Sequence, residues 1–405
     1  MNKRKLFFQF FTVMVVCITL CFGQSDIDIN DIRKSAEQGN ADSQWQLGVL
    51  YYLGKGVTEN NADENKWKHL GIGVIDDKTE AVKWYRKSAE QGNANGQWRL
   101  GMCYQLGNGV QKDEAEAVNW YRKSAEQENS IGQVQLGDCY QSGIGVTKDK
   151  AEAIKWYRKS AEQGNDGGQL RLGDCYLFGI GVKKDENEAV NWYRKSAEQG
   201  NAFGQLNLGD CYLFGVGVKK DENEAVNWYR KSAEQGNADG QYRLGDCYQL
   251  GSGVAKNKAE AVKWYRKSAE QVNDVGQLNL GNCYQYGIGV TKDGSEAVKW
   301  YRKSAEQGNA DGQVNLGDCY LLGIGVIEDE AEAVKWYRKS AAKGNAEGQY
   351  MLGSCYESGT GVTPKRTEAI KWYGKAAKQG HKDAESALNR LNNKNSQNRG
   401  YNRGY

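Results

Sequence analysis

Proline and histidine are scarce in this chain of 405 residues, which has one proline and two histidines. Because proline interrupts helices, its near absence leaves long helical segments uninterrupted. Imidazole is the usual general base and metal ligand near neutral pH, and His69 and His381 are its only sources here. The composition therefore disfavours general-base and zinc chemistry, and we predict no catalytic, cofactor or metal site.

A strong charge of either sign is missing as well. The chain has 54 lysines and arginines against 51 aspartates and glutamates, which gives a net charge of +3. Lys3, Arg4 and Lys5 account for this excess, since residues 1–23 contain no acid and their removal brings the net charge to zero. Binding to DNA or RNA depends on clustered positive charge. We therefore expect no nucleic-acid partner.

Long apolar runs are absent except near the start of the chain. Residues 6–22 follow three basic residues and precede Gly23, which is the layout of a secretory signal peptide. The run is slightly short for a membrane span of about 20 residues. We predict that residues 1–23 are a signal peptide and that the mature protein is exported, periplasmic or extracellular, with no integral membrane domain after cleavage. An uncleaved anchor is the alternative.

The chain is rich in regular spacing. Nine tryptophans and eight cysteines each recur every 36 residues. A fixed period of this length is typical of a solenoid built from one supersecondary element. The tryptophans are Trp84, Trp120, Trp156, Trp192, Trp228, Trp264, Trp300, Trp336 and Trp372, and the cysteines are Cys103, Cys139, Cys175, Cys211, Cys247, Cys283, Cys319 and Cys355.

One repeat, residues 204–239, shows the fold expected of all of them. Leu208, Cys211 and Tyr212 share one face of a first helix, at spacings of three and four residues. Glycines then mark a turn, and Asp221 begins a second helix, with Glu224 in the reciprocal arrangement of a capping box. Each repeat is thus an antiparallel helix pair that covers its apolar face by stacking on its neighbours.

This pattern predicts an all-α fold, a right-handed α/α superhelix of about nine 36-residue helix-turn-helix repeats. The low-complexity end of the chain has too little apolar surface to offset chain entropy, so we expect disorder there. We divide the chain into a signal peptide at 1–23, an N-terminal cap at 24–40, a solenoid at 41–391 with an insertion at about 58–74, and a disordered polar tail at 392–405.

The recurring cysteines and tryptophans are expected to be core residues. Equivalent positions of stacked helices lie about 8–10 Å apart, whereas a disulfide requires Cα atoms within about 7 Å. Unpaired cysteine is among the most buried residue types, and aromatic rings provide the largest apolar area of each repeat. We therefore predict buried, unpaired thiols and tryptophans that pack between repeats.

Two motifs have catalytic associations and a simpler structural explanation. Gly179-Ile180-Gly181 lacks the preceding strand and the following lysine–serine or lysine–threonine pair that a phosphate-binding loop requires, so we interpret it as a helix C-cap. Ser340 and Lys343 have the SxxK spacing of enzymes that react with β-lactams, without the two accompanying elements. Other repeats have glutamine in place of Lys343, which favours a substitution at a helix end.

The repeated motif resembles the Sel-1-like repeats, relatives of the tetratricopeptide repeats. The resemblance lies in LGDCYxxGxGV and EAVKWYRKSAEQGNAxGQ, as at residues 208–218 and 224–241, and it extends over about nine repeats. It implies an adaptor that mediates protein–protein interaction. A cysteine-rich bacterial branch of the family, associated with penicillin binding and β-lactamase activity, has two paired cysteines per repeat where this chain has one. That branch implies the alternative, a β-lactamase-like or peptidoglycan-binding protein associated with the cell wall.

The outward side of the first helices carries the candidate interaction surface. In the repeat at 204–239, Asn207, Asp210 and Phe214 fall within about 60° of one another on a helical wheel. If the first helices line a concave side, these columns form a groove that suits a protein or an extended peptide. The alternatives are a solvated face with aspartate–arginine pairs at i, i+3, and a spacer that binds nothing there. The predicted protein-binding residues are Arg171, Asp174, Phe178, Asn207, Asp210, Phe214, Arg243 and Asp246.

Overall fold

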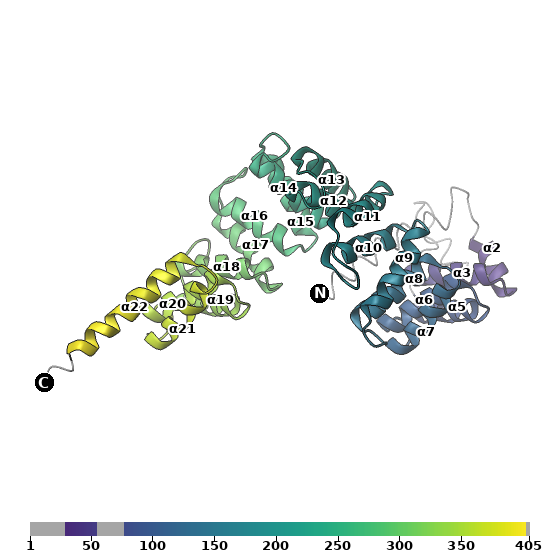
Figure 1. Ribbon diagram of the computed structural model, residues 1–405, viewed down its shortest axis with the longest axis horizontal. Coiled ribbons are helices and arrows are strands. Elements are labelled where there is room, and N and C mark those ends of the chain that lie inside the picture. Colours follow the sequence, from purple (N-terminus) through teal and green to yellow (C-terminus); the bar gives the residue numbers. More distant parts are fainter. Residues whose placement is uncertain (1–28, 55–76, 402–405) are drawn as a thin grey trace, which may run out of the picture. The chain divides into compact units, whose positions relative to one another are not determined.

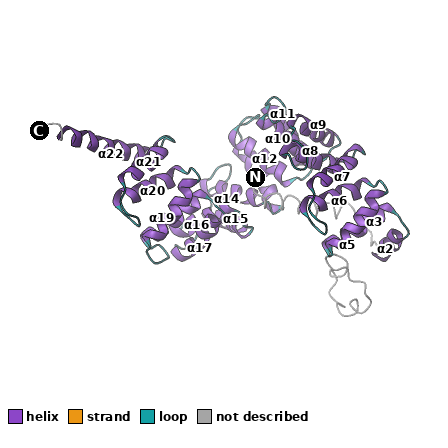
Figure 2. Ribbon diagram, turned by 90° about the horizontal axis from the view of Figure 1, so that it is seen from below, coloured by secondary structure: helices purple, strands orange, loops and turns teal. Residues whose placement is uncertain are grey.

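The computed structural model describes residues 29–54 and 77–401, and all regular structure within these ranges is helical (Figure 2). The chain divides into two compact halves between Gln199 and Gly200, and each half is considered by itself. The expected signal peptide, the start of the expected cap and the expected insertion at about 58–74 lie outside the described residues. Within the described ranges, no helix combines the length and the apolar content needed to cross a membrane.

Helix pairs follow one another along the chain as the 36-residue spacing predicts, which confirms the all-α repeat solenoid (Figure 1). The first helices of the repeats are α3 (Ala41–Leu53), α6 (Ala94–Leu106), α8 (Ser130–Ser142), α10 (Asp166–Phe178), α12 (Ala202–Phe214), α14 (Ala238–Leu250), α16 (Asp274–Tyr286), α18 (Ala310–Leu322) and α20 (Ala346–Ser358). The second helices are α5 (Lys78–Glu90), α7 (Glu114–Glu126), α9 (Lys150–Glu162), α11 (Glu186–Glu198), α13 (Glu222–Glu234), α15 (Lys258–Glu270), α17 (Gly294–Glu306), α19 (Glu330–Ala342) and α21 (Arg366–Ala377).

One additional helix lies at each end of this array. Helix α2 (Ile29–Glu37) precedes the first repeat and buries Ile32 and Ala36 against Leu47 of α3. Helix α22 (Lys382–Tyr401) packs on α21 and continues past residue 391, where we expected a disordered tail to begin. Between Gly380 and Gly400 the sequence has neither proline nor glycine to end the helix.

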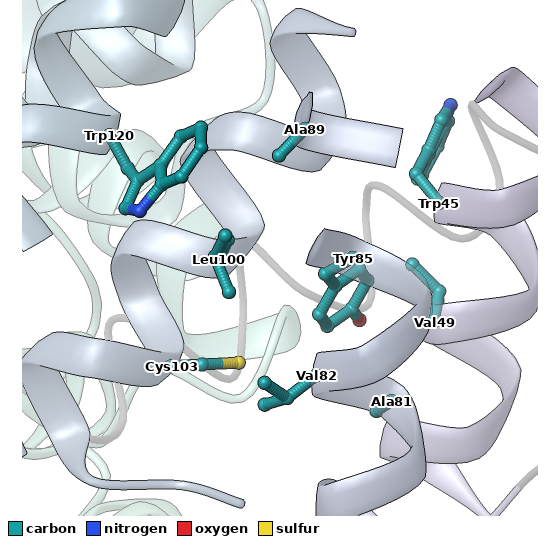
Figure 3. Close-up of a cluster of buried hydrophobic side chains, with 9 residues drawn as sticks. All are labelled: Trp45, Val49, Ala81, Val82, Tyr85, Ala89, Leu100, Cys103 and Trp120. Carbon is teal, nitrogen blue, oxygen red and sulfur yellow. The ribbon is translucent and has the colours of Figure 1, made fainter. Parts of the chain in front are cut away.

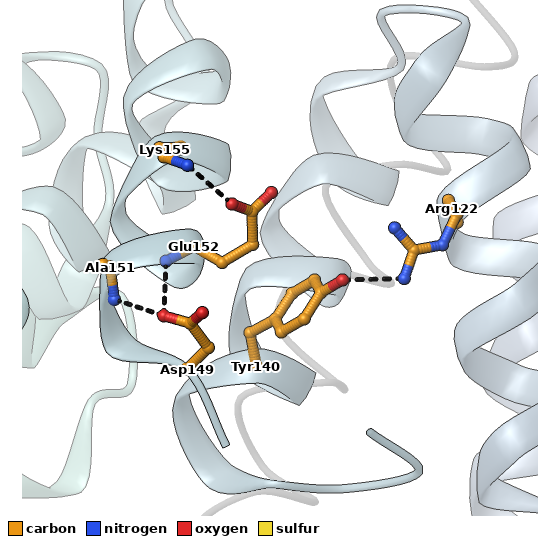
Figure 4. Close-up of polar contacts among 6 residues, drawn as sticks. All are labelled: Arg122, Tyr140, Asp149, Ala151, Glu152 and Lys155. Atoms are coloured by element: carbon orange, nitrogen blue, oxygen red, sulfur yellow. Dashed lines mark hydrogen bonds and ion pairs between the residues drawn. The ribbon is translucent and has the colours of Figure 1, made fainter. Parts of the chain in front are cut away.

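Aspartate side chains start most of the second helices. Asp149 accepts hydrogen bonds from the amides of Ala151 and Glu152, both at 2.9 Å (Figure 4). The reciprocal half of the predicted capping box is wrong, because the Asp149 amide donates to the carbonyl oxygen of Tyr140 at 2.9 Å. The Glu152 carboxylate instead binds Lys155, with Nζ at 2.9 Å. The hydrogen bond from the aspartate amide therefore links the start of each such second helix to the preceding first helix.

The glycine pairs between the two helices are caps and close contacts, as predicted. Gly179 ends α10 with a φ of 64°, in the left-handed region that glycine adopts most readily. Gly181 also has a positive φ, and a Cβ atom there would lie 2.2 Å from the carbonyl oxygen of Lys150 in the preceding second helix. These glycines therefore let the turns of neighbouring repeats approach one another.

The core is divided into clusters that join one repeat to the next. Trp120 of α7 lies in one buried cluster with Tyr85, Leu100 and Cys103 of earlier helices (Figure 3). The predicted role of the tryptophans in packing between repeats is thereby confirmed. All eight recurring cysteines are buried and unpaired, as predicted, and burial raises the pKa of Cys103 to about 12. Such thiols pack as small apolar groups and are poor nucleophiles.

Within each half, neighbouring first helices contact one another directly, as α6 does with α8 and α14 with α16. Among the described helices, no pair of neighbouring second helices approaches as closely. Repeats are thus closest on the first-helix side.

Candidate functional site

The eight predicted binding residues lie on three consecutive first helices. Arg171, Asp174 and Phe178 are on α10 in the first half of the chain. The other five, on α12 and α14 in the second half, are Asn207, Asp210, Phe214, Arg243 and Asp246. The structure separates these residues into two chemical groups, polar residues bonded within the fold and apolar residues exposed on its surface.

The carboxylate of Asp210 binds side chains of two other helices within the fold. The hydroxyl of Tyr229 on α13 donates to its carboxylate at 2.6 Å, and Nε of Arg243 on α14 lies 3.3 Å from the same oxygen. The pKa of Asp210 is raised above its ordinary value, mainly because the carboxylate is buried. One carboxylate thus joins three consecutive helices.

The same arrangement occurs in the first half of the chain. Asp174 accepts a hydrogen bond from the Tyr193 hydroxyl at 2.7 Å. Arg171 binds one repeat back, with its Nε 3.0 Å from Oδ1 of Asp138, which also accepts from Tyr157 at 2.7 Å. Aspartate–arginine pairs at i, i+3 would lie within one helix. The ion pair of Arg171 with Asp138 instead joins two neighbouring repeats.

Amides replace charged groups in this network without changing its geometry. Asp246 accepts from Tyr265 at 2.7 Å and from Nδ2 of Asn279 at 3.3 Å. Asn282 accepts from Tyr301 at 2.7 Å and from Nδ2 of Asn315 at 3.0 Å. A hydrogen-bond acceptor, rather than a negative charge, is the shared requirement. We call these acceptors the aspartate ladder: Asp138, Asp174, Asp210, Asp246, Asn282 and Asp318.

Sequence reasoning missed the tyrosine partners of the ladder. The available signal is a constant separation of 19 residues between each ladder residue and its tyrosine, such as Asp318 and Tyr337. A buried tyrosine hydroxyl requires an acceptor, so this spacing identifies the pairing.

The apolar column has the opposite environment. Phe178 of the first half has 67% of its surface exposed. In the second half, one residue at the end of each of four consecutive first helices is similarly exposed: Phe214 at 60%, Leu250 at 70%, Tyr286 at 65% and Leu322 at 64%. We call these four residues the apolar row. Arg243 borders it, with its guanidinium carbon 5.9 Å from the centroid of the Phe214 ring.

Ser340, the one serine with SxxK spacing, has a structural position. It is buried, and its hydroxyl donates to the carbonyl oxygen of Ala310 at 2.9 Å. Ser304 makes the same bond to Asp274 at 2.8 Å one repeat earlier. Lys343 ends α19 and donates to the carbonyl of Gly308. The β-lactam alternative therefore gains no support from this pair. Among the described residues, no cluster of histidine, cysteine and acidic side chains has a metal-binding arrangement.

Comparison with known proteins agrees with the repeat architecture. The Sel1 repeat model matches ten segments, of which the first two fall within the repeat that contains the expected insertion: residues 41–64, 67–93, 94–129, 130–165, 167–201, 202–237, 238–273, 275–309, 310–345 and 346–381. A search of curated proteins gives no match.

Two solved bacterial structures are similar over most of their length. A protective antigen present in uropathogenic Escherichia coli strains, which displays an SLR fold, is 40% identical, with 90% of this chain and 82% of that chain covered and a TM-score of 0.62. A Sel1 repeat protein from Oxalobacter formigenes is 32% identical, with 82% and 91% covered and a TM-score of 0.54. The chain therefore belongs to the Sel1 repeat family.

Proposed function

We propose that this chain is an exported scaffold whose first-helix surface binds an extended segment of a partner protein, with the apolar row as the main contact. Sel1 repeats typically form scaffolds for protein–protein interaction. The observation that carries the proposal is the exposure of Phe214, Leu250, Tyr286 and Leu322 at equivalent positions of consecutive helices. Contiguous exposed apolar surface is typical of interaction sites.

The fold itself does not require an apolar residue at this position. Ser142 ends α8 and Ser358 ends α20, at the helix position that Leu250 occupies in α14. Both serine-ending helices have the same length and the same left-handed glycine cap as α14. The apolar side chains thus contribute little that a small polar residue would not provide, which supports a role in recognition.

Repeat spacing favours a particular form of ligand. Neighbouring first helices lie about 8–10 Å apart, and a polyproline II helix rises about 9.3 Å over its three-residue turn. A peptide in that conformation presents one side chain per repeat when every third residue is apolar. A β-strand, which repeats its side-chain direction about every 6.8 Å, fits this spacing less well. We therefore propose a partner segment with apolar residues at every third position.

Export is supported by the sequence of residues 1–23, with three basic residues, an apolar run and a small residue before the polar segment. Fractionation of cells that express the full chain, followed by N-terminal sequencing of the mature protein, tests this part. We expect an N-terminus close to Gln24 in the exported fraction. An intact N-terminus in the membrane fraction would instead establish the anchor alternative.

The binding surface is tested by replacing the four residues of the apolar row with serine, the residue that ends α8 and α20. Crosslinking followed by affinity capture from the cell envelope and medium compares this variant with wild type. Ile327→Ser is the matched control, because Ile327 is 91% exposed and lies outside the row. We expect the four-serine variant to lose a partner that the control retains. Equal capture by all three proteins would contradict the proposal.

A further inference from the structure

Lysines lie directly beside the middle of the apolar row. Leu250 is followed by the capping glycine Gly251, and a Cβ atom on Gly251 would lie 3.2 Å from the Cβ of Lys256. Lys292 has the same position next to Tyr286, one repeat later. Both lysines are exposed. The charge of each is therefore available to a ligand that lies on the row.

In three other repeats, the lysine at this position of the turn forms an ion pair with a glutamate two residues later. The lysine nitrogen lies 2.5–2.7 Å from the carboxylate in the pairs Lys112–Glu114, Lys184–Glu186 and Lys220–Glu222. This glutamate is replaced by Lys258 after Lys256 and by Gly294 after Lys292. Within the described part of the chain, the three lysines beside the row therefore form no ion pair.

The turns that carry these lysines contain little opposing charge. The one acid in the turns at 251–258 and 287–294 is Asp293, whose side chain caps α17. Lys258 borders the second turn as well as the first, because a Cβ atom on Gly289 would lie 2.2 Å from the Lys258 carbonyl oxygen. Three lysines against one aspartate give the two turns a net charge of +2.

The sign of the charge reverses at the end of the row. The turn after Leu322, residues 323–330, contains Glu328, Asp329 and Glu330 and no basic residue. The Cβ of Glu328 lies 3.7 Å from the place that a Cβ atom on the capping Gly323 would take. The charge beside the row thus changes from positive at its middle to negative at its end.

Charges that flank an apolar contact surface select a partner of complementary charge and fix its register. We propose that the partner segment carries acidic side chains where it crosses Leu250 and Tyr286, and a basic side chain where it crosses Leu322. This inference rests on the proposed function, since it specifies the ligand of the same surface. A segment that is acidic throughout fits less well, because Glu328 repels its end.

Two lysines beside the row can be reversed in charge with residues that the fold already accepts. Glu328 and Glu330 occupy the positions of Lys256 and Lys258 two repeats later. The variant Lys256→Glu/Lys258→Glu therefore reverses the charge beside Leu250 and leaves the apolar row unchanged.

The first half of the chain provides a matched control. Lys148 and Lys150 have the same two turn positions, and Lys148 lies 3.2 Å from a Cβ atom placed on the capping Gly143. The residue before that glycine is Ser142, so these lysines flank no apolar residue of the row. Lys148→Glu/Lys150→Glu makes the same change of charge away from the proposed contact.

The test measures binding of three fluorescently labelled peptides to the full chain by anisotropy. Each peptide has four triplets that end in proline–leucine, which favours a polyproline II helix with leucine at every third position. The matched peptide begins its triplets with glutamine, glutamate, glutamate and lysine, the inverted peptide with glutamine, lysine, lysine and glutamate, and the neutral peptide with glutamine throughout. Binding in either chain direction places both glutamates of the matched peptide at the middle of the row.

We expect wild type to bind the matched peptide about 3- to 10-fold more tightly than the inverted peptide at low salt, the effect of two or three exposed ion pairs. The difference should shrink as the salt concentration rises. Lys256→Glu/Lys258→Glu should abolish or reverse the preference, whereas Lys148→Glu/Lys150→Glu should retain it. A preference that survives the first change, or that both double variants lose equally, would overturn this inference.

Failure of this inference is distinguishable from failure of the proposed function. Equal binding of the three peptides by wild type, with loss of all three in the four-serine variant, would overturn the charge assignment and leave the apolar row as the contact. Binding of none of the peptides by wild type, or equal binding by wild type and the four-serine variant, would count against the proposed function and this inference together.

Discussion

Gln313 and Lys343 do not form the hydrogen bond that joins the equivalent glutamines of the other repeats. One repeat earlier, Nε2 of Gln307 donates to Oε1 of Gln277 at 2.6 Å. Lys343 replaces that donor and points to the Gly308 carbonyl, so the buried Oε1 of Gln313 has no partner in the described structure. A single substitution has therefore left a buried acceptor unsatisfied.

Lys343→Gln should restore this bond. We expect the free energy of unfolding to rise by about 1 kcal/mol, the net contribution of a typical buried hydrogen bond. Urea denaturation of the full chain measures the change. Lys335→Gln, on the same helix, removes the same charge from an exposed ion pair with Glu332 and should change stability by less than about 0.5 kcal/mol. A gain no larger than that of this control would contradict the account.

Asp246 provides the test of the ladder as a structural element. Asp246→Asn recreates the environment of Asn282, so we expect stability to change by less than about 0.5 kcal/mol. Asp246→Val leaves the hydroxyl of Tyr265 without its acceptor and should cost about 1–3 kcal/mol. Urea unfolding compares the two variants. Equal losses would show that the negative charge, not the acceptor, is what the fold requires.

The ladder also predicts the sign of a pH effect. Burial raises the pKa of Asp246 above its ordinary value of 3.8, so the folded protein holds this proton at pH values where the unfolded chain has released it. The stability that this group contributes is therefore fully present below pH 3.8 and is lost as pH rises through the folded pKa. Asp246→Asn has no such group.

We therefore expect wild type to lose stability relative to Asp246→Asn as pH rises from 3.8 toward neutrality. Urea midpoints of the two proteins, measured at a series of pH values, give this difference directly. A difference that is constant with pH, or that changes in the opposite direction, would refute the assignment.

Alanine substitutions at two helix glycines, Gly245 and Gly374, should change the free energy of unfolding in opposite directions. A Cβ atom on Gly245 would lie 2.7 Å from the ring of Tyr265, so Gly245→Ala should cost about 1–3 kcal/mol through overpacking. A Cβ atom on Gly374 would meet nothing within 4 Å, and Gly374→Ala should stabilise by about 0.5–1 kcal/mol through better helix propensity. Denaturation curves of both variants test the pair. Similar changes in both would mean that helix–helix approach does not determine these positions.

The sequence was sufficient to predict the helix pairs, their aspartate caps and the buried cysteines, because these features depend on residues close together in one repeat. The role of Asp210 was not predictable in the same way. Its partners Tyr229 and Arg243 lie 19 and 33 residues later, and a helical wheel of one helix contains neither. Phe214 was placed correctly on the outside, since it lies at the helix end, beyond those contacts.

The missed half of the capping box has a similar cause. The Glu224 pattern was read from the local sequence, while the amide of Asp221 donates to the carbonyl of Tyr212 in the preceding helix, at 2.9 Å. Contacts between helices thus override a local motif wherever they compete for the same donor.

The central claim is that the aspartate ladder stabilises the fold while the apolar row binds the partner. The most direct measurement determines partner affinity and unfolding midpoint together for two full-length variants, Asp246→Val and the four-serine variant of the apolar row. We expect Asp246→Val to unfold at a lower temperature and, while folded, to bind as wild type does. The four-serine variant should keep the wild-type midpoint and lose binding. Loss of affinity in folded Asp246→Val, with normal affinity in the four-serine variant, would contradict the account.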